Sequence, residues 1–320
     1  MTWLIFLSTE RARMSFVKIF ASLLLLASPF VLANPVSLNP SPPLSPEQIQ
    51  QPYPEVSITR LHSAKELIAA FDTHDYRLKV VKQSNMLPSY FVENLPSDLN
   101  ELPVSQKTSA FIRLLLPTIK AVNRDILQIR DELQTLSAKP KSQWSEAERL
   151  WLQSLADTYA VKSGAIAELL LHIDVIPAGM VLAQGIDESG WGTSYFAITG
   201  NNLYGEHLPH NGGKFLTTPG GHVKVAAFDN LYQSTASYMH NLNTTLAYKE
   251  LRQLRQQLRL QKKLTGDELV QSLLHYSTRG QAYVDNLRAL IKRHHLDDFD
   301  SAKLTESDSI RYRFARRAKG

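Results

Sequence analysis

An uncharged run that stops at two carboxylates constrains this chain more than any other stretch. The run extends from Val175 to Ile186 and ends in Asp187 and Glu188, which are followed by the glycine-broken sequence SGWG. Pro177 suits the first turn of a helix, because its missing N–H would be unpaired there in any case. We therefore expect a buried helix that ends beside an aromatic loop, where a carboxylic acid can lie partly out of water.

Glu188 is the candidate general acid on chemical grounds. Desolvation disfavours the charged form of a carboxyl group and raises its pKa, as an acid working near neutral pH requires. Asp187 is a poor partner for it, since neighbouring helical residues point about 100° apart, and we expect Asp187 to be structural. The alternative is that both residues form the solvated end of a core helix with Gly190 as its C-cap. The local sequence leaves both interpretations open.

Four motifs follow one another in a recognisable order. They are AQGIDESGWGTSYFA, GNNLYG, AFDNLYQSTASYMHNL and YSTRGQAYVDNL. In this order they resemble the glucosaminidase domain of peptidoglycan hydrolases, glycoside hydrolase family seventy-three, to which the flagellar muralytic protein belongs. The runs YMHNLNTTLAYKELRQLRQQL and HYSTRGQAYVDNLRALIKRHHL look closer still to the Bax proteins of gammaproteobacteria. The resemblance covers residues 168–296 and implies a mainly α, lysozyme-like catalytic domain with a small β-hairpin lobe.

The resemblance also suggests which residues meet a sugar. Aromatic rings can stack on the apolar faces of sugars in clefts with a few polar anchors, and Trp191 and Tyr204 fall inside ESGWG and NNLYG. Asn201 and Asn202 are expected to hold the loop or to meet substrate amides. For each aromatic residue the alternative is ordinary core packing. The predicted substrate-binding residues are Trp191, Asn201, Asn202, Tyr204 and Tyr276.

A second catalytic carboxylate is hard to find in this chain. Turn signals at Asn211-Gly-Gly and Pro219-Gly-Gly predict a small hairpin within residues 206–228, and in the resembled family such a lobe carries a second acid. This hairpin contains no Asp or Glu, so Glu206 at its entrance and Asp229 at its exit remain, and we prefer Glu206. A single firm acid favours an inverting mechanism or attack by the substrate's own acetamido group.

Tyr283 is the third predicted catalytic residue. The family has a pattern like YATDPxYA at this junction, whereas the chain has YSTRGQAYV, in which Arg279 and Gly280 replace Asp-Pro. Tyr283 matches the second tyrosine, and its hydroxyl could orient the acetamido group or a water. Alternatively it is a buried aromatic whose hydroxyl is paired.

No metal, cofactor or nucleic-acid partner is predicted. The chain has no cysteine, which rules out thiolate zinc sites. His207, His210 and His222 lie in the glycine-rich hairpin without supporting carboxylates, so we expect surface histidines rather than ligands. There is no nucleotide-binding loop. The net charge of +5 suits an anionic cell wall, although many secreted proteins share this mild basicity.

The N-terminal part has the pattern of an exported protein. Residues 1–33 look like a signal peptide, and we expect the true start at Met14 and cleavage after Ala33. An uncleaved anchor is the alternative, but the apolar segment is shorter than the roughly 20 residues of a membrane span. We therefore expect a periplasmic protein with no stable membrane span after cleavage. Residues 34–56 are rich in proline and indicate an extended tether or a propeptide.

Residues 57–165 show helical patterns and are interpreted as a helical extension. Capping-box spacings occur at Ser63 and Ser145, and apolar spacing predicts a helix over residues 108–136 that Pro117 should kink or split. The proline-containing stretch 84–104 is expected to be irregular. Asp174 could cap the start of the central helix.

The catalytic domain is assigned to residues 166–298 and is followed by a polar, basic tail at 299–320, which we expect to be loose or to touch the anionic envelope. Within it, helices are expected over 231–246 and 248–261, and again from Tyr283 onwards. Arg252, Arg255 and Arg259 form a stripe that we expect to be solvated, or to meet wall phosphates or carboxylates.

The resemblance, together with the export pattern, implies a secreted hydrolase that cleaves the β-1,4 bond after N-acetylglucosamine in peptidoglycan glycan strands. Glu188 would act as general acid, followed by substrate-assisted or inverting attack. A lytic transglycosylase that leaves 1,6-anhydro ends is one alternative, and a catalytically inactive wall-binding module is another. The sequence does not identify a protein partner.

Overall fold

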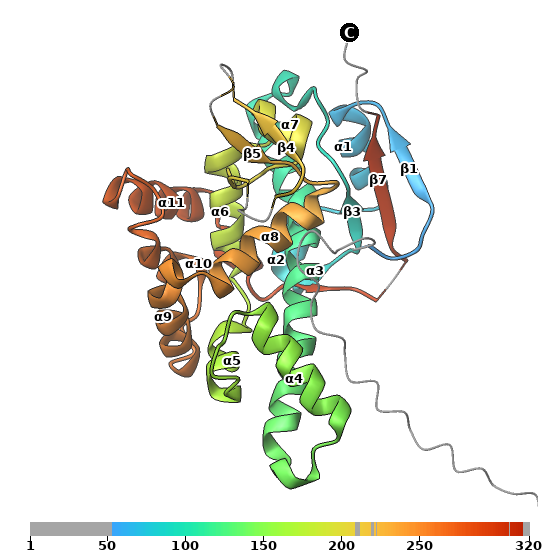
Figure 1. Cartoon of the computed structure of the whole chain (residues 1–320). Coiled ribbons are helices and arrows are strands. Elements are labelled where there is room, and N and C mark those ends of the chain that lie inside the picture. The colour runs from blue at the N-terminus through green and yellow to red at the C-terminus, as the bar shows by residue number, and fades with distance from the viewer. Residues whose placement is uncertain (1–52, 209–211, 219–220, 222, 307, 316–320) are drawn as a thin grey trace, which may run out of the picture. The chain divides into compact units, whose positions relative to one another are not determined.

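The computed structural model describes residues 53–208, 212–218, 221, 223–306 and 308–315. The predicted signal peptide and residues 34–52 of the proline-rich segment lie outside these ranges. Within them the fold is mainly α, as expected (Figure 1). No helix in the described ranges combines the length and hydrophobicity that a membrane span requires.

The elements follow the chain in this order. The α-helices are α1 (Ala64–Thr73), α2 (Leu78–Ser84), α3 (Val104–Ala138), α4 (Glu146–Thr158), α5 (Ile166–His172), α6 (Ala178–Ser189), α7 (Tyr195–Gly200), α8 (Leu231–Thr244), α9 (Lys249–Leu260), α10 (Gly266–Leu269) and α11 (Gln281–His294). The strands are β1 (Ile58–Leu61), β2 (Met86–Leu87), β3 (Tyr90–Val92), β4 (Phe215–Thr217), β5 (Lys224–Ala226), β6 (Lys303–Leu304) and β7 (Ile310–Phe314). Short 3-10 helices include Leu99–Glu101, Lys141–Gln143, Leu246–Tyr248, Val270–Leu273 and Leu296–Phe299.

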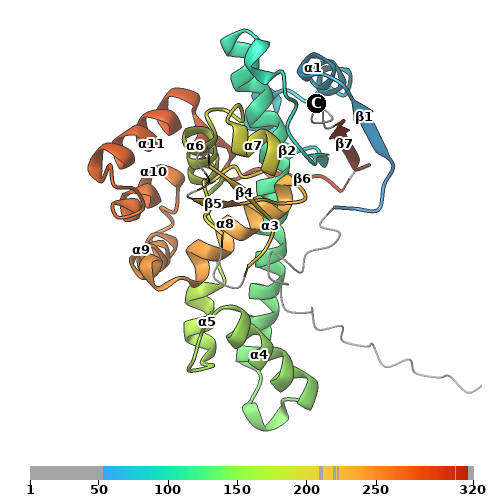
Figure 2. The same cartoon turned by 45° about the horizontal axis from the view of Figure 1, so that its top comes forward.

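Helix α6 lies at the centre of the packing. It contacts α3, α10, α11 and the turn at Leu296–Phe299, and nearly all of its residues are buried. Helix α8 also packs against α3, while α4 and α5 lie beside the C-terminal part of α3 (Figures 1 and 2). One hydrophobic core runs through residues from Tyr53 to Phe314. The helical extension therefore shares its core with the predicted catalytic domain.

The local signals for helix starts work as predicted. Ser145 and Glu148 form a reciprocal capping box. Ser63 also accepts from Glu66 N–H, but the Glu66 carboxylate accepts from His62 N–H instead of the Ser63 N–H. The predicted hairpin is present as the antiparallel pair of β4 and β5.

Helix α3 runs through Pro117 without being split, contrary to one of the two outcomes we expected. Proline has no N–H, so the carbonyl of the residue four positions earlier loses its helical partner. That carbonyl belongs to Arg113, and the buried Tyr76 hydroxyl donates to it at 2.9 Å. A side chain from the preceding segment thus replaces the missing hydrogen bond.

The prediction of a loose, basic tail at residues 299–320 is wrong for the part that the structure describes. Strand β7 lies between β1 and β3 and is parallel to both, with Tyr312 and Phe314 buried. The arginines on either side of Tyr312 are not free cations, because Arg311 and Arg313 both donate to the buried Glu93 carboxylate, at 2.8 and 2.6 Å. Pairing with a distant acid makes a basic segment suitable for the centre of a sheet.

The same sheet corrects two further predictions. The stretch 84–104 contains β2 and β3 rather than only irregular backbone, so the extension is not purely helical. Tyr53, at the end of the proline-rich segment, is buried; its hydroxyl donates to Val92 O at 3.4 Å and accepts from Tyr232 N–H at 3.1 Å. Residues 53–56 are therefore part of the fold and not of a free tether.

We predict that replacing Tyr76 by Phe destabilises the protein by about 1–3 kcal/mol, because the Arg113 carbonyl loses its only compensating donor in a buried environment. Urea unfolding followed by circular dichroism would measure this change. The control is Tyr195→Phe, since the Tyr195 side chain is 56% exposed. Equal stability of the two variants would contradict the role assigned to the Tyr76 hydroxyl.

Candidate active site

Helix α6 ends at the SGWG loop, as its sequence predicts. Gly190 adopts the left-handed conformation with φ 58° as the C-cap, and its N–H donates to Ile186 O. The buried Ser189 hydroxyl accepts from Gly192 N–H at 2.8 Å, which fixes the loop that follows. The helix end is thus an ordinary C-cap, and Glu188 in its last turn is also enclosed by other elements.

Glu188 is half-buried and receives a hydrogen bond from α11. The Tyr283 hydroxyl donates to its Oε1 at 2.8 Å. Burial raises the pKa of Glu188 above its ordinary value, and the charge of Asp187 adds to this rise. The Tyr283 hydrogen bond and the Arg279 charge act in the opposite direction but do not cancel the effect of burial. The carboxyl group therefore holds its proton at a higher pH than a solvated glutamate does.

Two residues that the sequence analysis did not select orient this hydrogen bond. The Tyr238 hydroxyl on α8 donates to Gln184 Oε1, and Gln184 Nε2 donates to the Tyr283 hydroxyl at 3.0 Å. Since the amide oxygen is occupied, the amide N–H faces Tyr283, whose own proton is then directed at Glu188. Burial raises the pKa of Tyr283, which keeps it a donor. Gln184 precedes Glu188 by four residues on an otherwise apolar helix, and this spacing was the available signal.

Asp187 has the structural role that we expected. Its carboxylate accepts from Arg279 and, at 2.6 Å, from Asn286 Nδ2 on α11. The Arg279 guanidinium also lies 4.5 Å from the ring centroid of Tyr283. The arginine that departs from the family pattern therefore ties the loop before α11 to the end of α6.

Tyr276 lies near both candidate carboxylates. Its ring stacks on that of Tyr283 at 5.5 Å, and its hydroxyl donates to Tyr204 O at 3.1 Å. Burial raises the pKa of Tyr276, and the negative charges of Glu188 and Glu206 raise it further. Tyr276 is therefore within electrostatic reach of both candidate carboxylates.

Glu206 is held more firmly than Asp229, the other candidate for the second acid. Its Oε2 accepts from the Ser237 hydroxyl at 2.8 Å, and its N–H donates to Asn202 Oδ1 at 3.1 Å. Asp229 instead pairs with Lys214, and its side chain is 56% exposed. Both carboxylates line a cavity of about 190 Å³ beneath the hairpin. The preference for Glu206 stays a prediction, now with a structural argument behind it.

Gly205 allows the hairpin entrance to approach Glu188. Its φ is 70°, a conformation that favours glycine, and a Cβ built there would lie 3.4 Å from Glu188 Oε2. That distance is an ordinary contact, so the left-handed φ, rather than a lack of room, favours the glycine that ends the motif NNLYG.

Three of the predicted substrate-binding residues are buried and already have partners. Asn201 donates to Phe228 O, and Asn202 donates to the carbonyls of Glu206 and Ala226. Tyr204 stacks on Tyr238 with ring centroids 4.1 Å apart. Since these side chains are 0 to 2% exposed, they have almost no surface for a sugar, and we reassign them to positioning the loop and the hairpin.

Trp191 lies among other aromatic groups. Its ring is half-buried and makes edge contacts with Phe111 at 6.0 Å and His294 at 5.0 Å. His294 is at the C-terminal end of α11, whereas Tyr283 is at the beginning of that helix. Substrate contact by Trp191 therefore stays a prediction. Of its two observed partners, Phe111 belongs to the core and His294 is half-buried.

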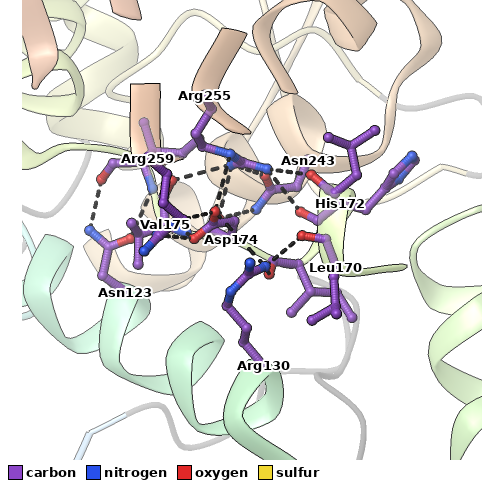
Figure 3. Close-up of polar contacts among 12 residues, drawn as sticks. Asn123, Arg130, Leu170, His172, Asp174, Val175, Asn243, Arg255 and Arg259 are labelled. Atoms are coloured by element: carbon purple, nitrogen blue, oxygen red, sulfur yellow. Dashed lines mark hydrogen bonds and ion pairs between the residues drawn. The ribbon is translucent and has the colours of Figure 1, made fainter. Parts of the chain in front are cut away.

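The N-terminal end of α6 is fixed by a charge network (Figure 3). Asp174 is buried and does not cap the helix; it accepts from Arg259 Nε at 2.8 Å. Arg255 donates to the carbonyls of Asp174 and Leu171 at 3.0 and 2.8 Å. Burial lowers the pKa of Arg255 to about 10, so it is charged at neutral pH. The prediction of a solvated stripe is wrong for Arg252 and Arg255, which are 3% and 1% exposed.

The C-terminal segment supplies the cap that we had expected from Asp174. Asp300 Oδ1 accepts from Gly179 N–H at 2.8 Å, and its Oδ2 accepts from Gly266 N–H at 3.1 Å. A Cβ at Gly179 would lie 2.1 Å from Asp297 Oδ1, so only glycine fits there. One carboxylate thereby caps the first turns of α6 and α10.

Nothing in the described ranges groups three or more His, Asp or Glu side chains as a metal site would. His207 pairs through its backbone with Val225, and His210 and His222 lie outside the described residues.

The chain is similar to a known protein family and to a known protein. Residues 164–296 match the glucosaminidase family, described as mannosyl-glycoprotein endo-beta-N-acetylglucosaminidase. Over 201 residues the chain is 35% identical to Protein bax of Escherichia coli (strain K12), which covers 60% of this chain and 72% of that protein. A solved structure with similarity to this chain is the catalytic domain of the autolysin Auto from Listeria monocytogenes. The match covers 54% of this chain and 97% of that chain, with 16% sequence identity and a TM-score of 0.31. The chain belongs to the Bax family and has a glucosaminidase domain at residues 164–296.

Proposed function

We propose that this protein is a peptidoglycan hydrolase that cleaves the β-1,4 glycosidic bond after N-acetylglucosamine. Membership of a glucosaminidase family supports a glycosidase, and the description of that family names the N-acetylglucosamine unit. The observation that carries the proposal is the half-buried Glu188 carboxyl group, which has a raised pKa and a single oriented donor in Tyr283. We also propose that the protein acts in the periplasm.

In the proposed reaction Glu188 protonates the glycosidic oxygen as the bond to the anomeric carbon breaks. Because its pKa is raised, the acid is available nearer to neutral pH than a solvated glutamate would be. The hydrogen bond from Tyr283 has a second effect, since it stabilises the carboxylate that remains after proton transfer. Burial thus keeps Glu188 protonated before the reaction, and the Tyr283 hydrogen bond stabilises the Glu188 carboxylate after the proton has been transferred.

The attack on the anomeric carbon has two possible sources. The acetamido oxygen of the substrate can attack from within the sugar, or a water can attack with Glu206 as general base. The hydrogen bond from Ser237 keeps the Glu206 carboxylate oriented, which supports its proposed role as the base. In either case water supplies the final hydroxyl and the proton that restores Glu188.

The central test uses purified protein lacking residues 1–33 and its Glu188→Gln variant, each incubated with isolated sacculi. Mass spectrometry of the released glycans should find reducing N-acetylglucosamine ends with the parent protein. The variant should be at least about a hundredfold slower, because general acid catalysis contributes 10²–10⁴-fold.

Other products of this experiment would support other functions. Anhydro-muramic ends would indicate a lytic transglycosylase. Intact sacculi that retain the bound protein would indicate a wall-binding module without catalysis. A Glu206→Gln variant that is as slow as Glu188→Gln would favour attack by water over attack by the acetamido group.

The pH profile tests the hydrogen bond from Tyr283. This bond lowers the pKa of Glu188, so Tyr283→Phe should raise it, and the alkaline limb of kcat/KM should move to higher pH. Tyr248→Phe changes a neighbouring tyrosine that does not contact Glu188 and should leave the limb in place. A shift to lower pH in Tyr283→Phe would mean that Glu188 is not the titrating acid.

Stability should show the cost of burying this carboxyl group. The pKa of Glu188 is raised in the folded state. Below the ordinary value of 4.5 the group is protonated in both the folded and the unfolded state, so it does not reduce the free energy of unfolding. As the pH rises through the folded pKa, the free energy of unfolding falls, because the unfolded state loses this proton more readily. Glu188→Gln should therefore have a higher melting temperature than the parent at pH 7, and the gain should vanish near pH 4. Asp187→Asn should do the opposite at pH 7, because it breaks the ion pair with Arg279.

A further inference from the structure

Arg279 lies beside the candidate general acid and is held there by two separate contacts. Its guanidinium donates to the Asp187 carboxylate. It also lies 4.5 Å from the ring centroid of Tyr283, whose hydroxyl donates to Glu188 at 2.8 Å. Asp187 and Glu188 are consecutive residues of α6. Both contacts therefore bring this cation to the end of α6 at which the candidate acid lies.

The loop before α11 fixes the position of Arg279. Gly280, the N-cap residue of α11, has φ 55° and ψ −126°, a conformation that favours glycine. The backbone N–H and Nε of Arg279 both donate to the Ser277 hydroxyl, at 3.3 and 3.4 Å. The two residues that replace the Asp-Pro pair of the family pattern thus provide a cation and the turn that holds it.

The ion pair between Arg279 and Asp187 presents its positive member to solvent. The Asp187 side chain is 14% exposed, whereas that of Arg279 is 47% exposed. Asn286 Nδ2 donates to the same carboxylate at 2.6 Å and helps to cover it. A guanidinium has five N–H donors, and within the described part of the chain Nη1 of Arg279 makes no hydrogen bond. The guanidinium can therefore accept a second anion.

Neighbouring acidic groups do not neutralise this cation further. Asp285 on α11 is the next acidic residue in the sequence, and it accepts from Gln281 Nε2 at 2.9 Å. Among the residues that the structure describes, Arg279 forms an ion pair with Asp187 alone. Glu188 carries its proton before the proposed reaction and then adds no negative charge. An anionic group of the substrate therefore finds a partner in Arg279.

The substrate of the proposed reaction has a carboxyl group near this place. Peptidoglycan strands alternate N-acetylglucosamine with N-acetylmuramic acid, so a cut after N-acetylglucosamine makes O4 of N-acetylmuramic acid the leaving oxygen. The adjacent carbon, C3, carries the lactyl ether of that sugar. The lactyl carboxyl group is therefore close to the oxygen that Glu188 would protonate. A cation beside Glu188 is within reach of it.

We propose that Arg279 binds the free lactyl carboxylate of the N-acetylmuramic acid unit on the leaving-group side, so that the protein prefers strands without stem peptides. This inference rests on the proposed function, because it depends on which bond is cleaved. In strands that carry stem peptides the lactyl carboxyl group is an amide without charge. Hydrogen bonds between charged groups are roughly twice as strong as neutral ones, so the carboxylate is the better ligand.

The proposal also places the protein in an order of reactions. Free lactyl carboxylates arise when the amide bond between the lactyl group and the stem peptide is hydrolysed. Water is consumed, the carboxylate stays on the sugar, and the amine leaves with the peptide. An amidase reaction of this class must therefore supply the preferred substrate before this protein acts.

The test measures kcat/KM on two matched substrates: strands with free lactyl carboxylates, and the same strands with these groups converted to methylamides. The protein without residues 1–33 should prefer the free carboxylate about tenfold, and the preference should decline at high salt. Arg279→Gln should abolish it. Arg293→Gln, near the other end of α11, is the matched control and should keep it, since Arg293 is an exposed arginine.

A second variant separates recognition from the structural role of the ion pair. Asp187→Asn breaks the same ion pair but leaves the guanidinium in place, so it should keep or increase the preference for the carboxylate. The preference is a ratio measured on one preparation, so partial unfolding does not change it. Loss of the preference in Asp187→Asn as well as in Arg279→Gln would mean that Arg279 only ties the loop to α6, and the proposal would be wrong.

Binding to the Glu188→Gln variant separates this proposal from the proposed reaction, because binding requires no hydrolysis. Calorimetry with the two substrates should show the same preference of about tenfold, and adding Arg279→Gln should remove it. Equal binding of the two substrates, although the parent protein cleaves strands, would overturn carboxylate recognition alone. A preference in binding without cleavage by the parent would overturn the proposed reaction alone.

Intact strands identify the source of the carboxylate. They carry carboxylates on their stem peptides but none on the lactyl group, so the parent protein should treat them like the methylamide strands. A preference for intact strands over methylamide strands that disappears in Arg279→Gln would mean that Arg279 binds a peptide carboxylate. That result would overturn the assignment to the lactyl group and the order of reactions that follows from it.

Discussion

The hydrogen bond from Tyr283 to Glu188 is the interaction on which the candidate site depends. It joins the last turn of α6 to the first turn of α11, and it is oriented by a buried series that runs from Tyr238 through Gln184. Because its pKa is raised, the Tyr283 hydroxyl keeps its proton and donates it to the Glu188 carboxylate. The position of the Glu188 side chain is therefore set before any substrate binds. Such preorganisation costs nothing at the moment of reaction.

Helix α6 can present Glu188 in a fixed place because its other end is also held. The N–H of Gly179 is capped by Asp300, while Arg255 fastens the carbonyls of the preceding turn. These contacts come from segments far away in the sequence, including one that we had assigned to a loose tail. The C-terminal segment thus supports the helix that carries the candidate acid. Residues 300–306 of this segment also line a cavity of about 910 Å³.

Several residues within the family motifs serve architecture rather than contact with a ligand. Asn201 and Asn202 tie the loop after α7 to the hairpin strands, and Tyr204 stacks in the core against Tyr238. Their burial explains why these residue types occur together: an amide can satisfy two carbonyls at once, and a stacked tyrosine fills the space between α6 and α8. The residues of a family motif can therefore be required for folding as well as for the chemistry of the site.

The sequence by itself determined the features that depend on neighbours in the chain: the end of α6 at Gly190, the capping box at Ser145, the hairpin of β4 and β5, and the inward face of α11. Only the tertiary structure decided which distant groups meet. Arg259 reaches Asp174 across 85 positions, and Arg313 reaches Glu93 across 220, so both arginines had seemed to be solvated charges. Gln184 was overlooked for the same reason, since the value of a buried polar group depends on partners that no local pattern reveals.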